Sequence, residues 1–280
     1  MKKITRRSFL AAAGLSVAAL ALTACGGSSS TASSVASSAA ASSEAASSSA
    51  AAAELTTVEA GKLTMATNAA FPPYEMTTDA GDFEGIDVET AQAIADKLGL
   101  ELQIDDMDFD AALLSVQQGK ADIVMAGVTV TDERKNVMDF SDSYATGIQS
   151  IIVPEGSDIA SPDDLAGKKI GTQRGTTGYI YCSDDFGDDA VVAYDDGLTA
   201  VQALNNGQVD AVVIDNAPAK EFVAANPGLV ILDTSYAEED YAIGMAKGNT
   251  ALEDAVNAAL EELKADGTLQ SIVDKYIVAE

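Results

Sequence analysis

A helix-then-strand segment occurs twice in the chain, 88 positions apart. The first copy reads AALLSVQQGKADIVMAG over 111–127, and the second reads TAVQALNNGQVDAVVID over 199–215. Gly119 and Gly207 take the same place in the two copies, where a helix should stop before a buried strand. The repeat predicts two similar lobes. Open α/β sheets bind ligands beyond the carboxyl ends of their strands, so the repeat points to Ala126-Gly127 in one lobe and Asp215 in the other.

Short β-rich runs alternate with amphipathic stretches from about residue 54 onward, which indicates an α/β fold with mostly parallel sheets. The roughly 227 residues of this part suit two lobes better than one core. The predicted strands cover 62–67, 101–107, 122–126, 169–173, 191–194, 211–214 and 229–232. The predicted helices cover 87–98, 110–118, 250–265 and 268–276, with another starting at Ser161-Pro162.

Residues 1–24 have the pattern of a signal peptide. Four basic residues precede an apolar run of 16 residues, shorter than the ~20 that a membrane-spanning helix needs. The run ends Leu22-Thr23-Ala24-Cys25, a lipobox that predicts a lipid on Cys25; a chance cysteine in an ordinary signal peptide is the alternative. Arg6-Arg7 also fits a twin-arginine export signal, and the general secretory route stays open.

Residues 25–53 are predicted to be a lipidated cysteine followed by a flexible linker rich in Ser and Ala. Cleavage before Cys25 would remove four of the 16 basic residues and leave 12 against 44 acidic ones, a net charge of −32. Such a chain lacks the clustered Lys and Arg that nucleic-acid binding requires. Anionic lipid would repel it, so attachment to a membrane would depend on the covalent lipid.

The chain has no histidine, which removes the commonest general base and metal ligand. The acidic run over 105–110 lacks the Gly and terminal Glu of an EF-hand loop, and the run over 184–189 reads as a solvated loop. We therefore predict no metal, no cofactor and no enzymatic activity. Cys182 is the only other cysteine, so no internal disulfide is predicted; we expect it to be buried, with a reactive thiol as the alternative.

Several short stretches together resemble the polar amino-acid family, family 3, of extracellular solute-binding lipoproteins of ABC transporters. The resemblance covers nearly all of 60–280, and the order and spacing of the stretches make it specific. Its densest parts are ATNAAFPPY at 66–74, GIDV at 85–88, MDF at 107–109, AGVTVTDER at 126–134, DFS at 139–141, GTT at 175–177 and DAV at 210–212.

The resemblance implies a site for a free amino acid. Arg134 would pair with the ligand carboxylate, near donors from Gly127, Thr129, Thr176 and Thr177; Asp215 and the Ala126 carbonyl would accept from the ammonium; Phe71 and Phe109 would sandwich the ligand; and Asn68 and Gln173 would face its side chain.

Each of these residues also has a structural alternative. From the residues alone, Arg134 is favoured as a surface charge of a helix, and the resemblance reverses that preference. Phe71 and Phe109 would by default be core aromatics. Asp215 could cap the following helix, but the repeat places it opposite Gly127 and favours a site role.

The resemblance also implies a two-lobed periplasmic-binding-protein-like fold of type II, in which ligand binding favours a closed form. We expect one lobe over 54–146 plus 244–280, a second over 152–237, and crossing strands near 147–151 and 240–243. The protein would be a monomer on the extracellular face of the cytoplasmic membrane that delivers its ligand to permease subunits.

The identity of the ligand rests on one position. Relatives for basic amino acids often carry an acidic residue where this chain has Asn68, so we predict a neutral polar, glutamine-like ligand. The alternatives are an exported enzyme of the same fold, similar to cyclohexadienyl dehydratase, and a ligand-sensing partner of a receptor.

Overall fold

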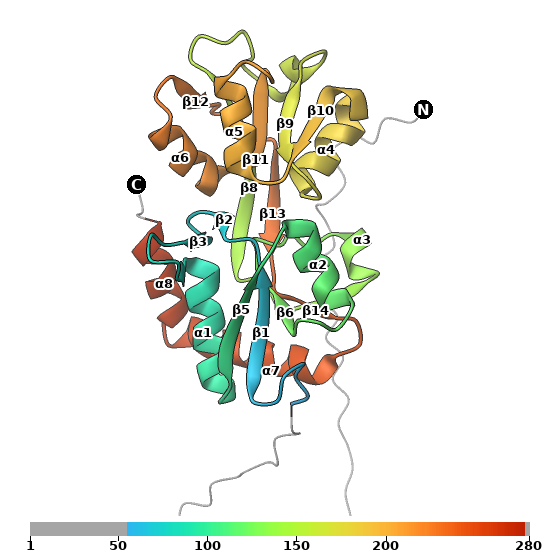
Figure 1. Ribbon diagram of the computed structural model, residues 1–280, viewed down its shortest axis with the longest axis vertical. Helices are drawn as coiled ribbons and strands as arrows, with labels where there is room; N and C mark the ends of the chain where they lie inside the picture. The colour runs from blue at the N-terminus through green and yellow to red at the C-terminus, as the bar shows by residue number, and fades with distance from the viewer. Residues whose placement is uncertain (1–54, 278–280) are drawn as a thin grey trace, which may run out of the picture. The chain divides into compact units, whose positions relative to one another are not determined.

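The computed structural model describes residues 55–277, which lie within one compact unit, Ala50–Glu280. The predicted signal peptide, Cys25 and the linker lie outside the described residues. The described part forms two α/β lobes (Figure 1). Within it, no helix combines the length and the apolar character needed to cross a membrane.

Lobe 1 is built on a five-stranded sheet of order β5-β1-β6-β14-β7. Helix α2 packs on one face, whereas α1, α7 and α8 pack together on the other (Figure 1). A small sheet, β2-β3-β4, lies beside α1. The elements are β1 (Lys62–Thr67), β2 (Ala70–Phe71), β3 (Glu75–Thr77), β4 (Phe83–Glu84), α1 (Ile86–Leu98), β5 (Glu101–Asp106), α2 (Phe109–Gln117), β6 (Ile123–Val124), α3 (Asp132–Lys135), β7 (Met138–Phe140), β14 (Gly244–Ala246), α7 (Thr250–Ala265) and α8 (Thr268–Tyr276).

Lobe 2 is built on a sheet of order β10-β9-β11-β8-β12, with β13 also paired to β8. Helices α5 and α6 pack against each other and the sheet, and α4 covers a separate core that contains Cys182, buried as predicted. The elements are β8 (Ala145–Pro154), η1 (Pro162–Leu165), β9 (Ile170–Gln173), α4 (Thr177–Phe186), η2 (Asp188–Ala190), β10 (Val191–Tyr194), α5 (Gly197–Asn205), β11 (Ala211–Asp215), α6 (Asn216–Ala225), β12 (Leu229–Ile231) and β13 (Ala237–Tyr241).

The repeated segment forms equivalent units, α2 with β6 and α5 with β11. Gly119 and Gly207 both adopt a left-handed backbone, with φ of 66° and 67°, where the helices end. Asp122 accepts a 2.7 Å hydrogen bond from Thr64 N, and Asp210 accepts a 2.8 Å one from Lys169 N. Each aspartate thus ties its strand to the start of the neighbouring parallel strand, which explains why both copies carry Asp at this place.

The two sheets are mixed. Strands β5, β1 and β6 run parallel in lobe 1, as do β10, β9 and β11 in lobe 2, and antiparallel strands extend both sets. Of the strand predicted over 122–126, only the two residues of β6 form a regular strand. The helix predicted at Ser161-Pro162 is a single 3₁₀ turn. Gly167, with φ of 78°, follows that turn and redirects the chain into β9.

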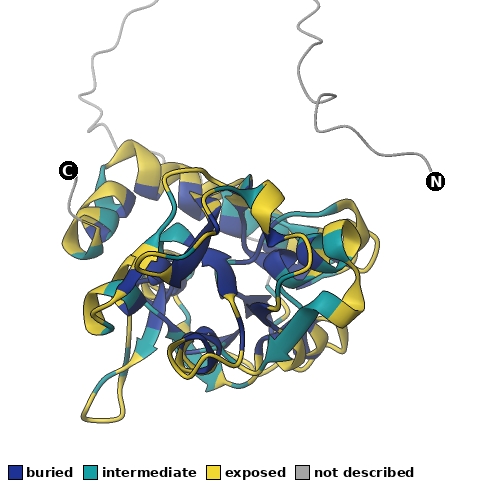
Figure 2. Cartoon of the chain, turned by 90° about the horizontal axis from the view of Figure 1, so that it is seen from above, coloured by how far each residue is buried: buried dark blue, intermediate teal, exposed yellow. Residues whose placement is uncertain are grey.

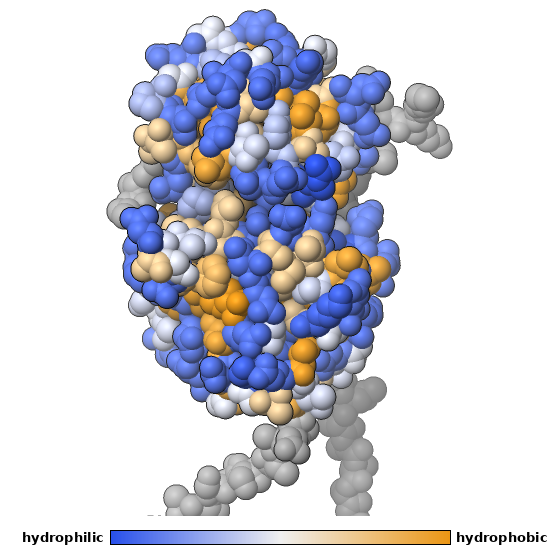
Figure 3. Space-filling view, in the orientation of Figure 1, coloured by the Kyte–Doolittle hydropathy of each residue, from blue (hydrophilic) through white to orange (hydrophobic). Residues whose placement is uncertain are grey.

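Strands β8 and β13 pair antiparallel at the junction of the lobes, from Ala237 opposite Gln149 to Tyr241 opposite Ala145. The central strands β1, β9 and β11 are buried, the edge strands β5 and β10 are mostly of intermediate exposure, and the outer faces of the helices are exposed (Figure 2). Hydrophilic residues dominate the face seen in Figure 3, in keeping with the many acidic residues. The predicted lobe boundaries and hinge residues remain predictions.

Candidate functional site

A cavity between the lobes collects all eleven residues predicted for the site. It holds an empty volume of about 320 Å³, including the part that opens to solvent. Its wall contains one further residue, Glu75, which the sequence analysis missed. The lining residues are Asn68, Phe71, Glu75, Phe109, Ala126, Gly127, Thr129, Arg134, Gln173, Thr176, Thr177 and Asp215.

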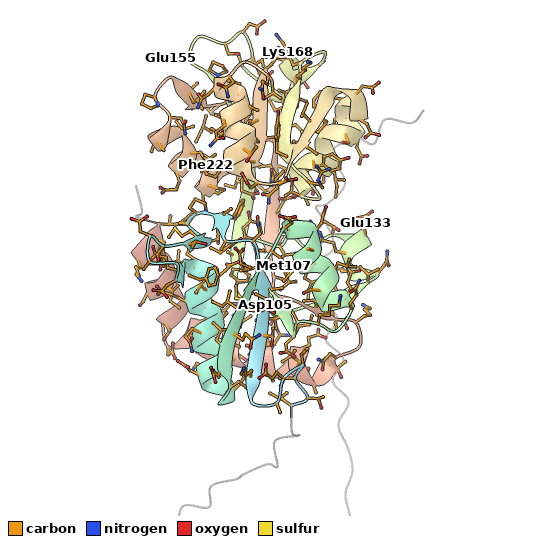
Figure 4. The ribbon with its side chains drawn as sticks, in the orientation of Figure 1. Asp105, Met107, Glu133, Glu155, Lys168 and Phe222 are labelled. Carbon is orange, nitrogen blue, oxygen red and sulfur yellow. The ribbon has the colours of Figure 1, made fainter. Side chains whose placement is uncertain are left out.

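Arg134 is buried, although its neighbour Glu133 is exposed at the outer side of α3 (Figure 4). The Thr131 hydroxyl accepts from Arg134 N at 3.1 Å and so caps this short helix. The guanidinium donates Nη1 to the Thr129 carbonyl at 2.7 Å and Nη2 to the Gly175 carbonyl of lobe 2 at 3.1 Å. Burial lowers the pKa of Arg134, while nearby acidic groups, Glu239 first, oppose that shift. The cation is therefore held at the lobe junction rather than on the surface.

Two aromatic rings and a glycine shape the lobe 1 wall. The Phe109 ring lies under the guanidinium of Arg134, 5.4 Å from its carbon to the ring centroid. Gly127 has φ of 54°, and a Cβ there would lie 2.9 Å from the Phe71 ring. A side chain at position 127 would therefore force the Phe71 ring to shift and would be strained by the left-handed backbone. The Gly127 N–H, expected to face the ligand, donates here to Asp87 at 3.0 Å.

Asp215 is buried at the carboxyl end of β11, and its side chain does not cap α6. It accepts from Gln149 Nε2 at 2.7 Å and from the Tyr241 hydroxyl. Burial raises the pKa of Asp215 to about 7, although the hydrogen bond from Tyr241 lowers it. The position expected from the repeat thus carries a buried carboxylate beside the cavity.

Three polar side chains donate hydrogen bonds to Glu239, a buried residue of β13. Its Oε2 accepts from Thr177 at 3.0 Å, Gln149 at 3.0 Å and Thr129 at 3.1 Å. Thr129 and Thr177 come from different lobes, and their hydroxyls lie 3.5 Å apart. Thr176 instead caps α4, where its hydroxyl donates to the Gln173 carbonyl and accepts from Tyr179 N.

Asn68 and Gln173 meet across the cleft, where Gln173 Nε2 donates to Asn68 Oδ1 at 2.8 Å. Asn68 Nδ2 donates in turn to the carbonyl of Met107, just beyond β5 (Figure 4). The two amides therefore bridge the lobes at one end of the cavity.

Glu75 is fully buried, and no donor reaches either of its oxygens as a carboxylate. Burial and the adjacent Asp87 raise the pKa of Glu75 well above its ordinary value, and a protonated Glu75 donates to Asp87. Burial also raises the pKa of Asp87 to about 6, against the stabilising bonds from Gly127 N and the Tyr144 hydroxyl. Glu75 thus lines the cavity wall as a buried carboxyl group that is paired with Asp87 when protonated and has no donor when ionised. Among residues 55–277 no three His, Cys, Asp or Glu side chains are placed to share a metal ion.

A second cavity lies beside the crossing strands and shares Asp215 with the first. It holds about 950 Å³ of empty space, including open solvent. Its walls include Pro73 and Tyr276 of lobe 1, Ala217 of lobe 2 and Ile148 of β8. Successive residues of a strand point to opposite faces. Gln149 contacts the residues of the ligand cavity, so Ile148 next to it faces the other side, and we name this space the hinge-side cavity.

The lobed fold and its central cavity define a class, that of proteins that enclose a small solute between two domains. The model of bacterial extracellular solute-binding proteins, family 3, matches residues 63–279, and the chain belongs to this family.

Three relatives show the range within that family. The chain is 34% identical over 226 residues to the L-cystine-binding protein TcyJ of Escherichia coli (strain K12), covering 79% of this chain and 85% of the relative. It is 31% identical to a putative ABC transporter arginine-binding protein 2 of the same strain, covering 79% and 93%. A solved structure of an ancestral arginine-binding protein bound to arginine shares 42% identity with this chain at a TM-score of 0.74, covering 78% of this chain and 98% of that one. A solved structure of an ancestral arginine-binding protein bound to glutamine shares 41% identity at a TM-score of 0.75, covering 78% of this chain and 99% of that one. The names of these similar proteins describe them as amino-acid-binding proteins, and one is named as a putative ABC transporter protein.

Proposed function

We propose that this protein captures a free L-amino acid between its lobes and delivers it to the permease of an ABC importer. One observation supports the proposal most strongly: a buried cation, Arg134, and a buried carboxylate, Asp215, both lie on the wall of a single cavity. These charges complement the carboxylate and ammonium groups that every free amino acid carries. The guanidinium suits bidentate binding of a carboxylate.

We further infer which amino acid is bound, and the buried carboxyl group of Glu75 favours arginine. Its oxygens lack donors, and a buried carboxylate without a partner is costly. A guanidinium group supplies several donors together with the opposite charge. The ancestral relative crystallised with arginine agrees with this choice.

Glutamine is the second candidate, and Asn68 with Gln173 favours it. The amides offer neutral partners at the end of the cavity, and a Glu75 that stays protonated adds no charge. A similar solved structure, an ancestral arginine-binding protein bound to glutamine, agrees with this candidate. The two candidates differ in whether ligand binding makes the Glu75–Asp87 pair release a proton to solvent: the arginine guanidinium would favour the ionised pair, whereas glutamine would leave it protonated.

Calorimetry of the purified protein against all twenty amino acids and cystine tests the proposal. We expect arginine to bind most tightly. Glu75→Gln should weaken arginine binding roughly 10-fold or more, because it removes the acidic group that would pair with the ligand guanidinium, and should change glutamine binding much less. Glu84→Gln, an exposed change in the same lobe, is the control. Tighter binding of glutamine than arginine would establish the neutral ligand, and a wild-type protein that binds no amino acid would refute the function.

The export and anchoring of the protein complete the proposal. A lipid on Cys25 and the Ser/Ala-rich linker would hold the lobes near the permease on the outer face of the membrane. Mass spectrometry of the membrane-associated protein should show the lipid on Cys25, and Cys25→Ser should release the protein into the medium.

A further inference from the structure

The carboxylate of Asp215 is oriented by both strands that cross between the lobes. Gln149 of β8 donates to its Oδ2, and Tyr241 of β13 donates to its Oδ1. Neither residue was predicted for the site. Each oxygen of Asp215 is therefore tied to a different strand at the junction.

Packing on three sides holds the Tyr241 ring in place. Tyr241 is the largest of the fully buried side chains, and Tyr74 meets its ring edge-on, with 5.3 Å between centroids. A Cβ at Gly147 would lie 2.4 Å from the ring, and one at Gly127 would lie 3.3 Å from it. The ring therefore packs edge-on against Tyr74 and close to the backbone at Gly147 and Gly127, and this packing restricts where its hydroxyl can lie.

We propose that Tyr241 is a positioning residue for ligand binding: its hydroxyl aims the Asp215 carboxylate at the ligand ammonium and stabilises the ionised form of that carboxylate. This inference rests on the proposed function. The hydrogen bond from the Tyr241 hydroxyl has two effects: it fixes the position of one carboxylate oxygen of Asp215, and it stabilises the negative charge of that buried carboxylate. The other oxygen, held by the neutral amide of Gln149, receives no comparable acidic donor.

The surroundings of Asp215 contain more acids than bases. The titratable groups that face it are Tyr241 and Glu239 of β13, Tyr74 and Glu75 beside β3, Arg134 of α3, and Lys220 of α6 in the wall of the hinge-side cavity. Burial and Glu239 raise the pKa of Asp215, whereas the bond from Tyr241 lowers it, so that it lies at about 7. Without the hydroxyl, the pKa should rise further, and less of Asp215 would be ionised at neutral pH.

The test is the pH dependence of arginine binding to Tyr241→Phe, measured by calorimetry on the whole chain between about pH 6 and pH 9. We expect binding on the order of 10-fold weaker than wild type near pH 6, with the ratio shrinking toward three-fold or less near pH 9, where Asp215 is ionised in both proteins. Tyr236→Phe is the matched control, because its hydroxyl donates to Asp185 at 2.7 Å outside the cavity. The control should follow wild type at every pH.

An equal loss at every pH would mean that Tyr241 only packs, and no loss would mean that it does not position Asp215; either result overturns the inference. If wild type binds none of the twenty amino acids or cystine in the calorimetry described above, the proposed function fails instead, whatever Tyr241→Phe does. If Tyr241→Phe does not fold, Gly147→Ala replaces it, because the added Cβ displaces the ring and should give the same pH dependence.

Discussion

Gln173 of lobe 2 donates a 2.8 Å hydrogen bond to Asn68 Oδ1 of lobe 1, so two residues predicted to read the ligand side chain also join the lobes. An aspartate at position 68 would keep the acceptor for Gln173 and add a negative charge. Asn68→Asp should therefore raise the preference for arginine over glutamine by about 10-fold, since a charge-assisted bond replaces a neutral one. Competition calorimetry with the two ligands measures this ratio. Asn206→Asp, an exposed change after α5, should leave it unchanged; an unchanged ratio in Asn68→Asp would show that the ligand side chain does not reach position 68.

Arg134 is expected to supply most of the binding of the ligand carboxylate. Arg134→Ala should weaken amino-acid binding by at least ~100-fold, because a buried bidentate ion pair is lost. The melting temperature without ligand should change by only a few degrees, since burial already disfavours the charged guanidinium, as its lowered pKa shows. Arg174→Ala, which removes an arginine that is 56% exposed, is the control. Normal stabilisation of Arg134→Ala by ligand would contradict the carboxylate assignment.

The buried acids predict that the ligand-free protein loses stability as pH rises from about 4 to about 7. Asp215 and Asp87 have folded-state pKa values of about 7 and about 6, both raised by burial from 3.8. In this range the folded state holds protons that the unfolded state has released, so the free energy of unfolding falls by about 1.4 kcal/mol per pH unit for each such group. Thermal unfolding measured across this range tests the slope.

The same measurement on Asp215→Asn isolates one of the two groups. The asparagine variant should show a shallower decline between pH 5 and pH 7, whereas Asp163→Asn at an exposed position should keep the wild-type slope. Parallel curves for wild type and Asp215→Asn would mean that the folded state does not retain the proton on Asp215.

Much of this architecture could be predicted because its signals are local. The repeat marked equivalent units, and Gly119 and Gly207 do end their helices in the left-handed conformation. The ends of β6 and β11 both reach the cavity, so the general rule for α/β sheets located Gly127 and Asp215. The last two helices, α7 and α8, lie at the bounds predicted from the sequence.

The missed residues depend on contacts between distant segments. Gln149 lies opposite Asp215 through the register that pairs β8 with β11, and Glu239 joins them through the register that pairs β8 with β13. Strand β13 reads AEEDY, which has little β propensity, and forms because β8 supplies its hydrogen bonds. Glu75 follows two prolines and a tyrosine in a short strand, and nothing in that pattern distinguishes a buried carboxyl group from an exposed one.

The hinge-side cavity leads to a prediction about closure. It lies on the opposite face of β8 from the ligand cavity, and both lobes contribute walls to it. If the lobes open by bending at the crossing strands, the ligand cleft widens while the hinge-side cavity narrows.

A bulky residue at Ala217 should therefore hinder opening and slow ligand dissociation several-fold by favouring the closed form. Ala217→Trp should also make the ligand-free protein more compact in small-angle X-ray scattering. Ala224→Trp, an exposed change on the same helix, should do neither. Faster dissociation from Ala217→Trp would mean that the lobes do not pivot about β8 and β13.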